Sequence, residues 1–384
     1  MNGLNLSEVS DIRLGSNTIN ALYYGSTLLW PLTPRDYSKE YLTIKSRYYG
    51  ETLTIRFIKN NTKISRSIQY SKDKINWTTI SFNTSDNPTK IELNPSEKIY
   101  LKGTNSSYAE VSDSGLNYCN IRVSGNGFAD MYGNIMSLIY GDNFYGQTVL
   151  TSDNTFRYLF VDSLSGSSSI ADAHNLVLPA TTLTKSCYKY MFNNCTMLST
   201  PPVLLPATTL ADSCYEGMFY NCESLVTAPV LPATTLAYDC YRDMFNECEN
   251  LRDAPVLPAT TLAKGCYYSM FRSCYKLTVA PVLPATTLAY DCYREMFYSC
   301  DNLTTAPDLP APTLTNACYR EMFRNCTKIN YIKCLATDIS DPNSLIYWVD
   351  GVASTGTFVK NPNMSNWPTG TDGIPSGWTV QDAS

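Results

Sequence analysis

Charged side chains are scarce in this chain of 384 residues. Asp, Glu, Lys and Arg make up 16% of it, and the formal net charge is −5 at pH 7. Proteins that bind nucleic acid or an anionic membrane surface neutralise phosphates with clustered Lys and Arg, which this composition does not supply. We therefore expect neither nucleic acid nor an anionic membrane surface as a partner. The 29 tyrosines favour a surface of hydroxyl groups and aromatic faces, which suits neutral polar targets such as glycans.

The sequence also lacks a long apolar run. No stretch approaches the roughly 18 apolar residues of a membrane-spanning helix. Residues 1–30 lack the basic start and the apolar centre of a secretory signal. We therefore expect no membrane insertion, and a chain that stays soluble in the cell that makes it. The exceptions would be a trimmed sequence or exit by another route, such as assembly into a virus particle.

Histidine is nearly absent, because His174 is the only one. Neither G-x-S-x-G nor H-E-x-x-H, the signatures of common hydrolases, occurs. Acid pairs recur at Asp239 with Asp243 and at Asp291 with Glu295, and glycoside hydrolysis does use two carboxylates. These pairs vary between repeat units, and their spacing predicts that they share one exposed helical edge. We expect a protein that is not an enzyme and that binds no cofactor.

Repetition is what the chain has in abundance. The hexapeptide L-P-A-T-T-L recurs along the chain at a nearly constant interval, and a variant continues the series. One unit of this length cannot bury its own apolar face, so units must stack with equivalent residues in contact. The sequence therefore predicts a repeat solenoid over residues 155–337. The hexapeptides begin at Leu178, Leu205, Leu231, Leu257 and Leu283, and the variant, with Pro312, begins at Leu309.

Each unit also carries the pattern C-Y-x-x-M-F-x-x-C. Its first cysteine and its phenylalanine are predicted to form ladders of like residues along the stack. Degenerate units flank the six good ones, as the exposed ends of a solenoid require. The predicted ladder residues are Cys187, Phe192, Cys214, Phe219, Cys240, Phe245, Cys266, Phe271, Cys292, Phe297, Cys318 and Phe323.

The local structure of a unit follows from its residue types. Prolines fix φ and push the preceding residue into extended conformations, and paired threonines favour pleated structure, so A-P-x-L-P-A-T-T-L is predicted to be extended. In the rest of the unit, Cys, Met/Phe and Cys recur about every four positions, which predicts one or two helical turns. A short strand alternating with a short helix is the leucine-rich repeat layout. The predicted class is an α+β repeat solenoid.

Twelve cysteines fall in the repeats, two per unit at a spacing of eight residues. Zinc sites use closely spaced C-x-x-C pairs, often with histidine, so no metal is expected. Disulfides need an oxidising compartment, for which the sequence carries no export signal. We expect free, buried cysteines that pack as small apolar residues. Disulfide bridges remain the alternative.

Other patterns divide the rest of the chain. Two similar elements, at residues 12–16 and 22–26, are bounded by Gly-Ser and predict a small β-hairpin. Alternating apolar runs between residues 36 and 110 predict the five or six strands of a β-sandwich. The predicted segments are the hairpin (1–34), the sandwich (35–110), a transition (111–154), the solenoid (155–337) and a β-rich C-terminal cap (338–384).

The variable positions outside the ladders are the candidate ligand surface. Aromatic and cationic side chains recur there at the edge of the predicted helical turns. An ordinary solvated edge is the alternative interpretation. The candidate contact residues are Tyr238, Arg242, Tyr268, Tyr290, Arg294 and Arg320.

The repeat unit L-x-x-A-P-x-L-P-A-T-T-L-A-x-x-C-Y-x-x-M-F-x-x-C-x-x-L resembles the BspA-like leucine-rich repeats of bacterial surface proteins. Its Pro, its Phe and the following Cys fall in register with that family's unit, although it is a few residues longer. This resemblance covers nearly half of the chain. The opening I-x-L-G-S…Y-x-G-S-T-L-L-W-P is similar to N-terminal elements of structural proteins from phages of Bacteroides, including crAss-like phages.

Together these resemblances imply a virion appendage protein, such as a tail or head fibre component. Its N-terminal hairpin would contact other virion proteins, and its repeats would bind a host cell-surface glycan or protein. A homotrimer is the usual assembly of such fibres. The alternatives are a bacterial cell-surface BspA-like adhesin and, third, a glycan-degrading appendage enzyme.

Overall fold

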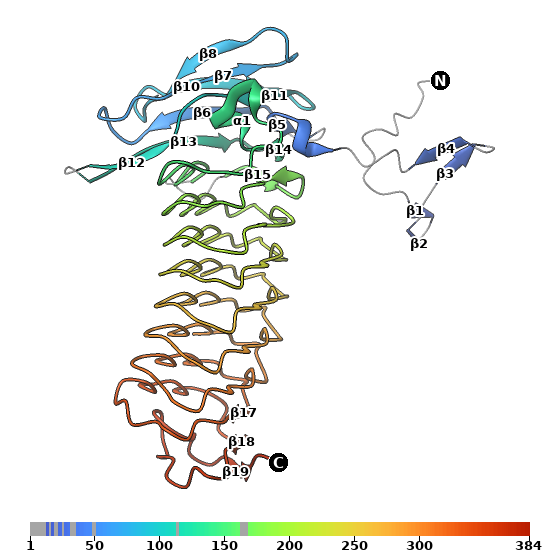
Figure 1. The fold of residues 1–384 in the computed structure, drawn as a ribbon. Helices are drawn as coiled ribbons and strands as arrows, with labels where there is room; N and C mark the ends of the chain where they lie inside the picture. The colour runs from blue at the N-terminus through green and yellow to red at the C-terminus, as the bar shows by residue number, and fades with distance from the viewer. Residues whose placement is uncertain are drawn as a thin grey trace.

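A computed structural model of the chain describes residues 13–14, 17–18, 22–24, 27–30, 36–47, 51–112, 115–161 and 168–384. A unit of two β-sheets leads into a long stack of coils that carries the C-terminus at its far end (Figure 1). The sheets and the coils share one continuous hydrophobic core. The predicted solenoid is therefore present.

In the predicted hairpin segment, 1–34, the described part consists of four short strands. Strand β1 (Arg13–Leu14) pairs with β2 (Asn17–Thr18), and β3 (Leu22–Tyr24) pairs with β4 (Thr27–Trp30), both antiparallel. The two similar sequence elements therefore do not pair with each other, because each one begins a hairpin of its own. The remainder of the predicted attachment segment lies outside the described residues.

Two sheets follow. The first has five strands in the order β10-β6-β13-β12, with β9 beside β6, and the second has seven in the order β15-β14-β5-β11-β7-β8, with β16 beside β14. Strands β13 and β14 pair with β6 and β5, so both sheets extend beyond residue 110. The strands are β5 (Leu42–Ser46), β6 (Leu53–Lys59), β7 (Ser67–Ser71), β8 (Thr78–Ser81), β9 (Asn83–Thr84), β10 (Thr89–Leu93), β11 (Lys98–Lys102), β12 (Ala109–Ser112), β13 (Gly115–Ser124), β14 (Ala129–Asn134), β15 (Ile170–Asp172) and β16 (Leu176–Val177).

The helical elements of the described residues are short and lie in this sheet unit. The 3-10 helix η2 (Tyr37–Lys39) precedes β5, and the α-helix α1 (Ser137–Tyr140) leads directly into the 3-10 helix η3 (Gly141–Asn143) after β14. None of the helices in this part of the chain has the length and apolar character needed to cross a bilayer.

The sheet unit and the solenoid are joined as one packed body. Strand β14 pairs in parallel with β15 and β16, which belong to the first coils. A row of aromatic rings also crosses the junction, from Phe82 through Tyr108 and Phe156 to Tyr188, with ring centroids 5.9, 6.3 and 5.5 Å apart. The two-sheet unit therefore covers the first coil, whose apolar face would otherwise be exposed.

The described coils contain no helix, so the predicted helical turns and the α+β class are wrong. The α-helix α1, outside the repeats, is the only one in the part of the chain that the structure describes. In the segment predicted to be helical, three residues of each repeat, spaced four apart, instead have positive φ; in one coil these are Ser213 (52°), Gly217 (58°) and Asn221 (54°). A left-handed residue at every fourth position interrupts a right-handed helix before it completes a turn. The segment is thus a series of β-turns within a β-solenoid.

Two kinds of backbone hydrogen bond alternate along these turns. The amide of Tyr215 donates to the carbonyl of Cys240 in the next coil (3.0 Å), whereas the amide of Met218 donates back to Tyr215 within its own coil (3.1 Å). The T-T-L side of the coils is joined by isolated parallel bridges, such as Thr261 with Thr287. Successive coils are therefore held by a main-chain ladder as well as by their side chains.

The side-chain ladders fill the interior. All twelve predicted ladder residues are fully buried. The rings of Phe219, Phe245 and Phe271 stack almost parallel, with centroids 5.7 Å apart at both steps, and the tyrosines that follow the first cysteines stack in a second column. Because like residues lie above one another, each coil buries the aromatic faces of its neighbours.

The cysteines are free and buried. In each repeat the second cysteine donates its thiol proton to a phenylalanine carbonyl in the coil before; Cys248 Sγ, for example, lies 3.1 Å from the oxygen of Phe219. Burial raises the pKa of the Cys240 thiol to about 12, which keeps it protonated. The thiols thus serve as small apolar residues that also satisfy buried carbonyls.

Coiling continues past residue 337. Strands β17 (Tyr331–Cys334), β18 (Thr357–Lys360) and β19 (Thr379–Asp382) form a parallel three-stranded sheet in which each strand belongs to a successive coil. Trp348 is fully buried and extends the aromatic column, with its ring 6.3 Å from Tyr319 and 6.1 Å from Trp367. Large indole rings therefore replace the smaller rings at the C-terminal end of the stack.

Candidate binding face

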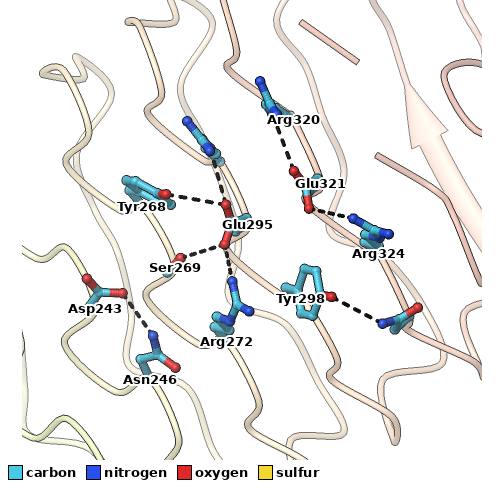
Figure 2. Close-up of polar contacts among 12 residues, drawn as sticks. Asp243, Asn246, Tyr268, Ser269, Arg272, Glu295, Tyr298, Arg320, Glu321 and Arg324 are labelled. Carbon is cyan, nitrogen blue, oxygen red and sulfur yellow. Dashed lines mark hydrogen bonds and ion pairs between the residues drawn. The ribbon is translucent and has the colours of Figure 1, made fainter. Parts of the chain in front are cut away.

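The β-turns of the repeats present a continuous polar surface, which we name the arginine–tyrosine face. The residue before a left-handed position, such as Tyr238, lies at the surface, whereas the residue after it, such as Cys240, is fully buried. Equivalent positions in successive coils form columns to which each coil contributes one residue. Part of the face is drawn in Figure 2. It comprises Lys189, Glu216, Tyr238, Asp239, Arg242, Asp243, Lys264, Tyr268, Arg272, Tyr290, Asp291, Arg294, Glu295, Tyr298, Arg320, Glu321 and Arg324.

Cations and aromatic rings alternate along its columns. The Tyr268 ring lies between the guanidinium groups of Arg242 and Arg294, at 4.4 and 4.9 Å from its centroid. In another column, Lys264 lies between Tyr238 (5.6 Å) and Tyr290 (4.7 Å). Each such contact contributes about 0.5–1 kcal/mol at an exposed site. The cations are therefore held in place over the rings.

The acidic residues lie beneath this layer and are paired with arginine or, for Glu216, with Lys189. The Glu295 side chain is only 8% exposed; it accepts from Arg272, from Arg294 Nε at 3.3 Å and from the Tyr268 hydroxyl at 3.3 Å (Figure 2). Asp239 is also 8% exposed and lies 3.5 Å from Arg242. The charges of the face are thus largely neutralised within it.

The prediction that the acid pairs share an exposed helical edge is wrong. Asp239, Asp243, Asp291 and Glu295 all have positive φ and sit in turns, with side chains between 8% and 17% exposed. Burial raises the pKa of Asp239 and of Asp243, and the neighbouring Arg242 partly opposes this rise. A carboxylate is buried only where a cation pairs with it. The sequence pattern does not show which arginine lies beside each acid, so it did not predict the burial.

The six predicted contact residues all fall on this face. Tyr238 and Tyr290 are 44% and 42% exposed, on either side of Lys264 in one column. The other four share the adjacent column: Arg242, Tyr268, Arg294 and Arg320. The structure adds Lys264, Arg272, Tyr298 and Arg324, which sequence reasoning did not single out. The last three each lie four residues after a predicted contact, so the four-residue period of the unit could have found them.

One glycine allows a buried acid to fit. Gly265 has φ +61°, and a Cβ built on it would lie 2.1 Å from Asp239 Oδ1. The equivalent residue Ala317 adopts the same backbone conformation (φ 54°), so this conformation alone does not require glycine. The glycine is therefore required for the space that the Asp239 carboxylate occupies.

We expect Gly265→Ala to lower the free energy of unfolding by about 1–3 kcal/mol, because Asp239 must leave Arg242. In an Asp239→Ala background, the same change should cost less, because only the strain of a left-handed alanine remains, which is about 1 kcal/mol. Urea unfolding of the four proteins in a double-mutant cycle measures the difference. Additive effects within about 0.3 kcal/mol would contradict this account.

A second surface of the coils, which we name the valine strip, is uncharged and was missed by sequence reasoning. Residues 229–237, 255–263 and 281–289 have the identical sequence P-V-L-P-A-T-T-L-A, without a charged side chain. Val256 and Val282 are 79% and 78% exposed, and the threonine pairs are exposed beside them. Exposed valines are not needed to build the core. Their identical repetition in three successive units was the feature of the sequence that could have revealed this surface.

The described residues contain no group of three or more His, Cys, Asp and Glu side chains arranged to hold a metal ion. Comparison of the chain with protein-family models, with curated proteins and with solved structures finds no match. The functional proposal therefore rests on the chemistry of the arginine–tyrosine face and the valine strip.

Proposed function

We propose that this protein is a virion appendage component, in a tail or head fibre, whose solenoid binds a neutral glycan or a protein on the host surface. The observation that carries the binding role is the pair of exposed rings, Tyr238 and Tyr290, on a face whose acids and bases neutralise one another. Rigid aromatic groups with neutral polar surroundings are typical of anchoring contacts. The resemblance of the repeat to BspA-like units and the phage-like N-terminal pattern support the setting.

The repeated architecture favours an extended target. Lys264 orients both rings, and equivalent positions recur once per coil, so a polymer can contact several coils at once. Net affinity would then be the sum of several weak contacts. In this proposal the N-terminal segment attaches to other virion proteins, and three copies assemble as in other fibres.

We expect the full chain to bind immobilised glycans or proteins of the host envelope, and Tyr238→Ala with Tyr290→Ala to weaken that binding by about tenfold or more, since an aromatic anchor contributes roughly 1–3 kcal/mol. Val256→Ala, which removes an exposed side chain from the valine strip, is the matched control and should leave binding unchanged. A glycan array followed by titration of the best ligand measures both. Equal affinities for all three proteins would remove the arginine–tyrosine face from the proposal.

The setting has a separate test. Mass spectrometry of purified virions should detect the polypeptide, and virions without it would contradict the appendage role. A bacterial cell-surface adhesin is the second candidate, favoured by the BspA-like unit. Its distinguishing outcome is protein on the surface of intact, uninfected cells.

A further inference from the structure

The two-sheet unit contains a hollow that the solenoid-binding proposal does not use. Its volume is about 450 Å³, within the range of roughly 300–1,000 Å³ typical of small-molecule sites. The lining residues come from strands β7 and β8, from the end of β11 and from the turn from α1 into η3. Side chains that line it include Ser67, Gln69, Thr79, Lys102, Asp142 and Asn143.

A fixed ion pair lies at the wall of the hollow. Lys102 Nζ donates to the two carboxylate oxygens of Asp142, at 2.8 and 3.0 Å, and the Tyr41 hydroxyl donates to Oδ1 at 2.7 Å. The lysine side chain is 11% exposed, with its ammonium 4.1 Å from the Trp77 ring centroid. The Asp142 side chain is 63% exposed. The carboxylate is therefore oriented from behind while its remaining lone pairs stay accessible.

Besides Ile68 and two glycines, the rest of the lining consists of neutral side chains that both donate and accept hydrogen bonds. Gln69 and Asn143 contribute amides, and Ser67, Thr79 and Thr104 contribute hydroxyls. The contact of Gln69 Nε2 with Thr79 Oγ1, at 3.5 Å, links two of these groups across neighbouring strands. Tyr140 also lines the hollow, and its hydroxyl donates to the carbonyl of Val149 (2.8 Å), which fixes the position of its ring.

We propose that this hollow binds a neutral polyhydroxylated molecule, namely a single sugar unit or the end of a glycan. Adjacent sugar hydroxyls can donate to the oriented Asp142 carboxylate while they exchange hydrogen bonds with the Gln69 and Asn143 amides. Lys102 already neutralises Asp142, so the site offers no unpaired charge to an anion or a cation. The hydroxylated class fits better than an apolar ligand, because most groups of the lining are polar.

The site is independent of the arginine–tyrosine face, since the two surfaces share no residue. The full chain is titrated with the methyl glycosides of glucose, galactose, mannose and N-acetylglucosamine, and with glucuronic acid as the charged comparison. Saturation-transfer NMR and tryptophan fluorescence, to which Trp77 contributes, report binding. We expect saturable binding of at least one neutral glycoside, and glucuronic acid to bind at least tenfold more weakly.

Gln69→Ala and Asn143→Ala should each weaken that binding by tenfold or more, whereas Val256→Ala on the valine strip should not change it. Hydrogen exchange adds a readout that needs no variant, because the ligand should slow exchange in residues 67–69 and 140–143. The proposal is overturned if no neutral glycoside saturates, if Gln69→Ala and Asn143→Ala bind normally, or if protection appears only in the coils. Failure of the Tyr238 and Tyr290 test would leave this result unaffected.

Discussion

Replacing Phe245 by alanine is expected to lower the free energy of unfolding by about 3–5 kcal/mol. The ring is fully buried between Phe219 and Phe271, 5.7 Å from each, so its removal leaves a cavity and uncovers two aromatic faces. Coils contact only their neighbours, and an interior defect therefore breaks the stack in two. Urea unfolding followed by circular dichroism measures the loss.

The position of the ring supplies the control. Tyr290→Ala removes an aromatic ring of similar size that is 42% exposed, and it should cost less than about 1 kcal/mol. Phe245→Leu keeps most of the buried volume and should lie between the two. A loss below about 1 kcal/mol for Phe245→Ala would mean that the aromatic column does not hold the coils together.

Alkaline solution is expected to unfold the protein cooperatively. A thiol exposed by unfolding titrates near pH 9, whereas burial raises the pKa of Cys187 and of Cys240 to about 12. Burial also raises the pKa of the column tyrosines, including Tyr241 and Tyr267, well above 10. The fold thus binds protons more tightly than the unfolded chain, so its stability is complete below pH 9 and falls as the pH rises from there through about 12.

The number of such groups makes the effect large. Burial raises the pKa of eleven thiols in the repeats. Each of these removes about 1.4 kcal/mol of stability per pH unit above 9. A typical stability of about 5–15 kcal/mol would then be exhausted between roughly pH 9 and 10. Circular dichroism and tyrosinate absorbance should change together in one transition. Ordinary tyrosine titration with the circular dichroism unchanged would contradict the burial of this column.

The stacking of the coils was predictable from the sequence because the same residues recur at the same positions of each repeat. A hexapeptide such as L-P-A-T-T-L, repeated at a constant interval, can bury its apolar side chains only against copies of itself, and Phe245 and Cys240 follow from that pattern. The helical turns failed for a physical reason. A four-residue period fits both an α-helix and a run of turns, and the deciding residues are those that adopt positive φ, such as Gly217 and Asn221. Ser, Asn, Asp or Gly at most of these positions was the signal for turns.

The candidate face was predictable in part. Tyr238 and Tyr290 were found because variable aromatic residues in a repeat are candidates for the surface. The burial of Glu295 was not predicted. A glutamate is buried only where cations pair with it, and its partners Arg272 and Arg294 come from two different coils. The hollow in the sheet unit was beyond sequence reasoning, since Lys102 and Asp142 are joined only by the tertiary fold.

The identical nine-residue stretches that begin at residues 229, 255 and 281 make the middle of this molecule modular. Where one coil offers the next the same backbone ladder, the same rings and the same thiols, a whole coil can be deleted or duplicated and both cut surfaces still match. The reach of the protein, from the sheet unit to the C-terminal tip, is therefore adjustable in increments of about 4.8 Å, the spacing of parallel strands. Length and surface chemistry can change separately in such a molecule.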